Sequence, residues 1–107
     1  MIESTETGTR CISVVVIGRK WFQKSYGNTY HTAQIIIDGA TVHKTPLTYG
    51  YGEQYMQSAA DWLEDNGYMP GREHYPHGGA EMLPMYFRRH NVGVTYEALD
   101  VRRERDA

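Results

Sequence analysis

The first half of the chain alternates short apolar segments with turn residues, which predicts β-strands. An almost continuous apolar run from Ile12 to Ile17 lies in a stretch rich in β-branched and aromatic residues. It indicates a central strand or one covered on both faces. The pair Asp38-Gly39 is a strong hairpin signal, because both positions of such a turn need positive φ. The expected strands are therefore 11–22, 29–37 and 40–45.

A two-residue turn at this point also predicts the register of the hairpin. Ile37 should face Ala40, Ile35 should face Val42, and Gln34 should lie near His43. Side chains alternate between the two faces of a strand, so the hairpin should have one core face and one polar face. The expected core face carries Ile35, Ile37, Ala33, Ala40 and Val42, and the polar face carries Tyr30, Thr32, Gln34, Ile36, Thr41, His43 and Thr45.

The second half of the chain changes to helical spacing. Residues 53–66 predict a helix with a core-facing stripe, ended by Asn66-Gly67, and residues 81–90 predict a shorter helix with Pro84 near its first turn. Residues 92–101 predict the last strand, which could pair beside the first. The order β-β-β-α-α-β predicts an α+β two-layer sandwich, with an antiparallel sheet of about four strands and the helices on one face.

Length and cysteine content limit the class of protein. The 107 residues are expected to form one domain spanning 1–107, with flexible segments at 1–9 and 103–107. A single cysteine, Cys11, excludes a disulfide-built scaffold. No apolar run is long enough to span a bilayer, and the first ten residues are too polar for a signal peptide. We therefore expect a cytoplasmic protein with no membrane partner and no cofactor.

The net charge of −2 hides an uneven distribution. Residues 1–50 carry five Lys/Arg and three Asp/Glu, whereas residues 51–107 carry six and ten. Between Arg19 and Ile37 there are three cations and no acid. This local basic patch also holds aromatic rings, and it is the predicted recognition surface, made of Arg19, Lys20, Trp21, Lys24, Tyr26, Tyr30, Gln34 and His43.

That surface has two interpretations. The cations could hold phosphates while Trp21, Tyr26 or Tyr30 stack on bases, which would make the protein a nucleic-acid or nucleotide binder. Alternatively, the rings belong to the core and its cover, and the cations are solvated residues that discourage pairing at a sheet edge. The acidic balance of the whole chain does not favour strong non-specific binding of nucleic acid.

Other motifs give weaker indications of a binding or catalytic site. The Gly50-x-Gly52 loop before a helix could cradle an anion, but the carboxylate of Glu53 already occupies that position. His74 and His77 are candidate metal ligands, with His90 or Cys11 as a third, although Pro76 rules out helical presentation. The sequence contains no catalytic constellation, so a small metal-dependent enzyme is the weakest of the alternatives.

Two segments resemble a set of small uncharacterised proteins from tailed bacteriophages. The matching residues are Arg19-Lys20-Trp21-Phe22 with Tyr26-Gly27-Asn28-Thr29-Tyr30-His31-Thr32, and Thr48-Tyr49-Gly50-Tyr51-Gly52-Glu53 with Tyr55 and Ser58-Ala59-Ala60. The resemblance covers residues 19–66 and implies a phage origin without assigning an activity. Small phage proteins are often accessory factors that bind host machinery, including defence systems. We therefore expect a non-enzymatic module that binds a host or phage protein, with a homodimer as a further expectation.

Overall fold

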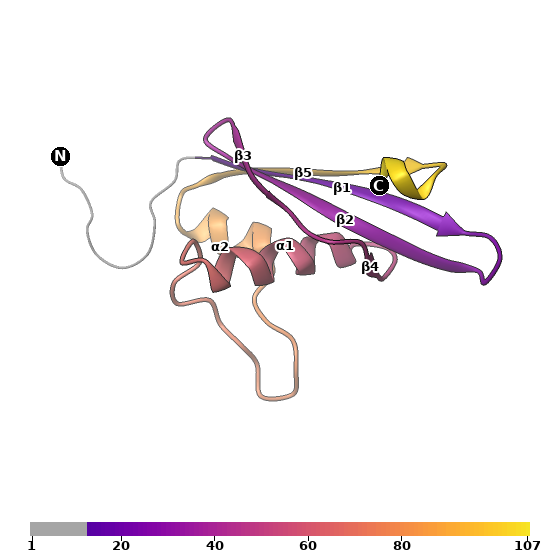
Figure 1. Ribbon diagram of the computed structural model, residues 1–107. Helices are drawn as coiled ribbons and strands as arrows, with labels where there is room; N and C mark the ends of the chain where they lie inside the picture. The colour runs from indigo at the N-terminus through magenta and orange to yellow at the C-terminus, as the bar shows by residue number, and fades with distance from the viewer. Residues whose placement is uncertain (1–12) are drawn as a thin grey trace.

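The computed structural model describes residues 13–107, so Cys11 and the segment 1–9 lie outside the described part. The chain is α+β, as predicted, with a sheet on one side and helices below it (Figure 1). The strands are β1 (Ser13–Gln23), β2 (Asn28–Ile37), β3 (Ala40–Lys44), β4 (Thr48–Tyr49) and β5 (Gly93–Val101). The helices are α1 (Gln54–Asp65), α2 (Leu83–Arg89) and the short 3₁₀ helix η1 (Glu104–Asp106).

The sheet is mixed, so the predicted antiparallel sheet of about four strands is wrong in detail. Its order is β3-β2-β1-β5, and β4 adds a fifth strand that pairs with β2. The last strand does lie beside the first, but the two are parallel, with Gly93 opposite Ser13 and Val101 opposite Trp21. The connection through α1 and α2 returns the chain to the end of the sheet where β1 begins, which makes the pair parallel.

The β2–β3 hairpin confirms the predicted turn. Asp38 and Gly39 both have positive φ, at 51° and 88°, and Ile37 faces Ala40. Beyond that point the predicted register is wrong, because an irregularity between Ile35 and Ile36 places Ile35 opposite His43. One extra residue in a strand moves the following side chains to the other face. His43 therefore leaves the predicted polar face and lies on the helix side.

The core lies between the sheet and the two helices. On the sheet side it contains Val14, Val16, Ala33, Ile35 and Ile37, and on the helix side Tyr55, Met56, Ala59, Ala60, Leu63, Leu83, Tyr86 and Phe87. Ala40 and Val42, predicted to face the core, are exposed because β3 lies at the edge of the sheet. Small residues from three neighbouring strands, Ala33, Gly18 and Ala98, lie in one row of the sheet. Within this row, Gly18 provides the space for the ring of Tyr55.

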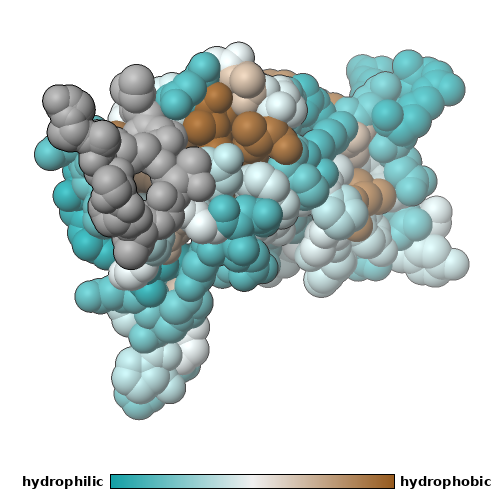
Figure 2. All heavy atoms as spheres, turned by 60° about the vertical axis from the view of Figure 1, so that its left-hand side comes forward, coloured by the Kyte–Doolittle hydropathy of each residue, from teal (hydrophilic) through white to brown (hydrophobic). Residues whose placement is uncertain are grey.

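The other side of the sheet, which we call the open face, has no helix of the described chain packed on it except η1 (Figure 1). Side chains of β1 alternate, so those that do not face α1 point to this face. Its middle carries an aliphatic strip of Val15, Ile17, Ile36 and Leu99, and Figure 2 shows hydrophobic side chains gathered on the upper surface. Within residues 13–107, neither helix has the length and hydrophobicity that a bilayer crossing requires.

Candidate functional site

Three aromatic side chains form a row across the open face, and we call this row the aromatic ladder. Trp21, Tyr30 and Tyr49 are direct neighbours on β1, β2 and β4. The ring centroids of Trp21 and Tyr30 are 5.8 Å apart, as are those of Tyr30 and Tyr49. Tyr49 is 58% exposed, while Trp21 and Tyr30 are half-buried. The structure thus brings two predicted recognition residues together and adds Tyr49, which was not among the predicted recognition residues.

A row of polar contacts lies beside the ladder on the same face. Arg19 Nη1 donates a hydrogen bond to Gln34 Oε1 at 2.9 Å, and Gln34 Nε2 donates to Thr41 Oγ1 at 2.8 Å. The predicted association of Arg19 and Gln34 on one surface is therefore present. The bond directs the Arg19 guanidinium toward Gln34, which lies opposite Ile17, and so away from the Trp21–Tyr30 pair of the ladder.

The C-terminal residues return across the open face. After β5 ends beside Trp21, residues 102–107 turn back through η1, which lies against β1. Lys44 Nζ on the far edge then donates a hydrogen bond to the main-chain oxygen of Ala107 at 2.9 Å. Crossing from β5 to β3 spans three strand spacings, about 15 Å, which six residues can cover. Thr32 points to this face and is only 4% exposed, as expected beneath such a crossing.

This crossing collects basic residues at one end of the molecule. We define the basic end as Arg19, Lys20, Lys24, Arg102, Arg103 and Arg105. The acids on the same two segments, 19–24 and 100–106, are Asp100, Glu104 and Asp106, of which Asp106 accepts a hydrogen bond from Arg103 at 3.4 Å. Glu97 lies nearby on β5, opposite Ile17. Over the rest of residues 13–107 there are four basic and eight acidic residues. The sequence did not reveal this polarity, because half of the cations come from the C-terminal segment.

Several other predicted recognition residues are not part of this row. His43 stacks on Trp62 of α1, with centroids 4.5 Å apart, so it belongs to the helix side. Lys20 also points to the helix side, where a shallow pocket is lined by it, Phe22 and Asp100. Lys24 and Tyr26 lie in the exposed turn between β1 and β2, and Tyr26 is 76% exposed. The predicted surface is therefore divided between two faces and a turn.

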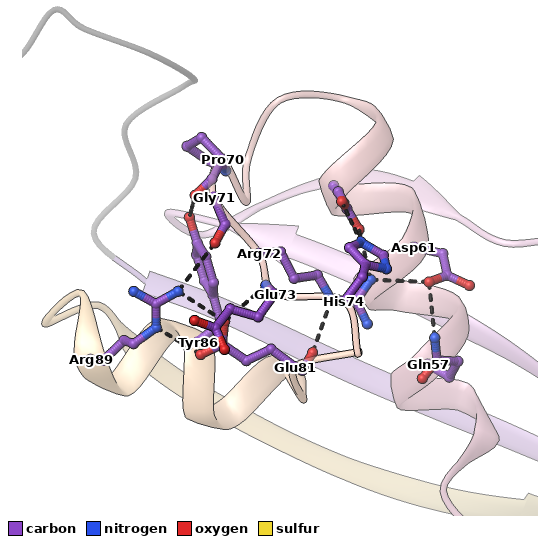
Figure 3. A network of polar contacts seen from close by, with 11 residues as sticks. Gln57, Asp61, Pro70, Gly71, Arg72, Glu73, His74, Glu81, Tyr86 and Arg89 are labelled. Carbon is purple, nitrogen blue, oxygen red and sulfur yellow. Dashed lines mark hydrogen bonds and ion pairs between the residues drawn. The ribbon is translucent and has the colours of Figure 1, made fainter. Parts of the chain in front are cut away.

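A polar network that the sequence did not indicate joins α1, α2 and the segment 70–82 (Figure 3). The side chain of Arg72 is fully buried. Its Nε donates to the main-chain oxygen of Glu81 at 2.9 Å, and its Nη1 donates to Asp61 and Glu64 at 3.1 and 2.9 Å. The carboxylate of Glu81 in turn accepts hydrogen bonds from Arg89 at 2.7 and 2.9 Å.

These charges shift several pKa values. Burial raises the pKa of Glu64, but hydrogen bonds from His74 and Arg72 outweigh burial, so the pKa lies below its ordinary value. Hydrogen bonds from Arg89 lower the pKa of Glu81 against the effect of burial, and the same contact raises the pKa of Arg89. Both carboxylates are therefore charged at neutral pH, and they stabilise the segment 70–82 as an anchored loop.

The histidine loop at the tip of this segment has a structural explanation. His74 Nε2 lies 2.7 Å from Glu64 Oε2, and an isolated bridge pairs His74 with Ala80. His77 is exposed near the tip, and His90 stacks on Tyr86, with centroids 4.4 Å apart. Among residues 13–107, no three His, Cys, Asp or Glu side chains come together as metal ligands would. The proposed third ligand Cys11 lies outside the described residues.

The glycine loop before α1 is fixed by a buried histidine. His31 Nδ1 lies 3.1 Å from the oxygen of Gly50, which can only accept, so Nδ1 carries the proton. His31 Nε2 lies 2.7 Å from Ser58 Oγ, which ties β2 to α1. A Cβ at Gly50 would lie 2.9 Å from Gln54 and 3.1 Å from His31, so the glycine is needed for close packing. This loop therefore has a packing role.

A small pocket of about 210 Å³ lies between the start of α1 and residues 82–83. Its lining combines the polar side chains of Glu53, which precedes α1, and of Gln54 and Gln57 with Met56 and Leu83. Arg72 lies at its base, and among the described residues Arg72 Nη2 has no hydrogen-bond partner. The carboxylate of Glu53 in the lining and the two acids already bonded to Arg72 do not favour an anionic ligand there.

Comparison with known proteins adds no assignment. No protein-family model matches the chain, and searches of curated proteins and solved structures found no significant match. The functional argument therefore depends on the exposed features of the fold itself, which are the aromatic ladder, the basic end, the aliphatic strip and the free edge of β5.

Proposed function

We propose that the protein is a non-enzymatic binding module that takes up an extended segment of a partner protein along β5. The observation that carries this proposal is the free edge of β5. Within residues 13–107, β5 pairs with β1 alone, and seven of its nine residues are exposed. A strand with one unpaired edge presents a row of main-chain donors and acceptors that an incoming strand can satisfy.

The opposite edge of the sheet supports the proposal by contrast. There β3 has five residues, β4 has two, and the strands are separated by Pro46 and bordered by Lys44. Short strands, irregular register, lysine and proline are the devices by which proteins prevent unwanted strand pairing. β5 is longer, continuous, and contains neither lysine nor proline. With only the charges of Glu97 and Asp100 along it, β5 is the less protected edge and therefore the one suited to binding.

Side chains beside this edge would provide specificity. Leu99, on the open face, and Tyr96, on the helix side, are each 43% exposed. Leu99 continues the aliphatic strip formed with Val15, Ile17 and Ile36. In strand addition, main-chain hydrogen bonds supply affinity and alternate side chains are read by neighbouring pockets. We expect the partner segment to carry apolar side chains at alternate positions toward the open face.

The resemblance to tailed-phage proteins directs the search to host or phage proteins, including components of host defence. The protein would be used as bait in a bacterial lysate, and the bound segment would be mapped by proteolysis. Hydrogen exchange of the β5 amides would then be measured with and without a synthetic peptide of that segment. We expect slower exchange in β5 and weaker binding of a Thr95→Lys/Leu99→Lys variant, with Tyr75→Lys as the matched control on the distant loop.

Two results would contradict the proposal. One is unchanged exchange in β5 when the peptide is bound, and the other is equal affinity of the edge variant and the Tyr75→Lys control. The same edge would also allow two copies to pair, which is the homodimer expected from the sequence. Analytical ultracentrifugation distinguishes this case, because self-association would rise with concentration and would be reduced in the edge variant.

A further inference from the structure

The aromatic ladder and the basic end lie together where β1 and β5 end, and they fit a different ligand from the strand proposed to pair with β5. The ladder exposes aromatic rings on three strands, and its flanks carry Arg19 and the cations of the C-terminal crossing. We propose that this surface binds a single-stranded nucleic acid without strong sequence preference. The proposal goes beyond protein binding along β5 and does not depend on it.

The geometry of the ladder suits unpaired bases. Trp21, Tyr30 and Tyr49 cross three strands, which at about 4.8 Å between strands gives a platform about 10 Å long. Sheets with exposed aromatic residues stack two or three bases in this way. The Tyr49 ring is the most exposed of the three, at 58%, and lies on a short edge strand. Bases within a duplex are stacked on each other and cannot reach such rings.

The charge at this end matches a phosphate backbone. The segments 19–24 and 100–106 carry six basic and three acidic residues, of which Lys20 and Asp100 point to the helix side, whereas the rest of residues 13–107 carries four basic and eight acidic residues. Because β1 and β5 are parallel and Val101 is the neighbour of Trp21, Lys24 and Arg102 both lie beyond the end of the strands that carries Trp21. A backbone that follows the ladder would therefore meet cations along the side where these strands end. The net charge of −2 conceals this local field.

Two features distinguish this surface from a sheet face whose aromatic residues only stabilise the fold. Aromatic neighbours stabilise a sheet wherever they occur, so ring contacts alone do not indicate a ligand. Here the rings coincide with the positive end of a chain that is otherwise acidic, and the exposed Tyr26 and Lys24 extend from the same end. Stacking rings within a cationic groove are the recurring elements of single-strand binding.

The experiment uses the full chain and a fluorescein-labelled 20-nucleotide oligothymidine, with the matching oligouridine and a 20-base-pair duplex as comparison probes. Fluorescence anisotropy would be recorded from 25 to 200 mM salt. We expect both single strands to bind more tightly than the duplex, and affinity to fall as salt rises. Tyr49→Ala should weaken binding about tenfold by removing one stacking ring. Lys24→Ala should reduce the slope of log affinity against log salt by about 0.7.

Matched controls are available at the other end of the molecule. Tyr75→Ala removes an exposed ring from the distant loop, and Arg88→Ala removes an exposed cation from α2. Both should bind the oligothymidine as the unchanged protein does. The proposal is overturned if neither single strand binds at 25 mM salt, or if the duplex binds as tightly. Equal losses of oligothymidine affinity in Tyr49→Ala and Tyr75→Ala would also overturn it. A protein partner whose binding requires Tyr49, together with no binding of either single strand, would overturn it as well.

Discussion

Replacing Gly18 by alanine tests whether the missing side chain beneath Tyr55 determines the packing of α1 on the sheet. A Cβ at this position would lie 2.4 Å from Tyr55 Cγ and 2.5 and 2.9 Å from the two Cδ atoms. Carbon atoms pack at about 3.5–4.0 Å, so the overlap is about 1 Å. Tyr55 is only 3% exposed and is enclosed by the core. The ring therefore has little space in which to move.

The expected magnitude combines two opposing effects. Overpacking a core costs about 1–3 kcal/mol. Replacing glycine by alanine also restricts the unfolded chain, which contributes about 0.4–1 kcal/mol of stability where the native backbone permits it. Gly18 lies in a regular strand and needs no left-handed conformation, so this gain applies. We expect Gly18→Ala to lower the free energy of unfolding by about 1–2 kcal/mol, which corresponds to about 5–15 °C in Tm.

The assay is urea unfolding followed by tryptophan fluorescence and circular dichroism. A double-mutant cycle with Tyr55→Ala gives the internal control, because it removes the ring that the new methyl group would meet. In that background Gly18→Ala should cost nothing or stabilise the protein. The steric reasoning fails if Gly18→Ala leaves the unfolding free energy unchanged, or if its cost is the same with and without the Tyr55 ring.

Three further predictions concern the polar groups of the core and the anchored loop. The pKa values of Glu64 and Glu81 are lower in the folded state than in the unfolded chain. Their contribution to the free energy of unfolding is therefore complete above about pH 4.5, and it is lost as the pH falls through the pKa values of the folded state. Glu81→Gln should therefore give a flatter acid-unfolding curve, and an equally steep curve would contradict this. Arg72→Leu should lower the free energy of unfolding by about 2–3 kcal/mol in urea, because it leaves carboxylates and a carbonyl without their donor; a loss below 0.5 kcal/mol would show the network to be dispensable. His31→Ala should cost about 2 kcal/mol by leaving Ser58 Oγ and a carbonyl unpaired, and Ser58→Ala, which removes one of these bonds, should cost less.

Local patterns predicted local structure well. Asp38-Gly39 predicted its turn because a two-residue turn requires positive φ at these two positions, and aspartate and glycine both tolerate it. The spacing of apolar residues placed α1 within one residue of its observed ends, and Pro84 lies in the first turn of α2 as expected. These features need only contacts between residues close in the chain, so a single sequence contains the information.

The features that sequence reasoning missed depend on distant contacts. The parallel pairing of β5 depends on the path of the chain through both helices, which no local pattern records. The irregularity at Ile35 and Ile36 places His43 on the helix side, where its ring stacks on the ring of Trp62. Arg72 was not a candidate because arginine is rarely buried, and its partners come from α1 and from Glu81. The acidic residues Asp61 and Glu64 on one helix face were the only local signal.

The parallel pairing of β1 with β5 also has a consequence for the order of folding. The β1–β2–β3 hairpins can form as soon as residues 13–44 have left the ribosome, because their contacts are close in sequence. β1, however, gains its second neighbour only after residues 93–101 are synthesised. During that interval the apolar run Val14–Ile17 lies on an uncovered strand edge of the nascent chain. We infer that the steps most open to chaperone binding, or to pairing between nascent chains, precede the arrival of β5.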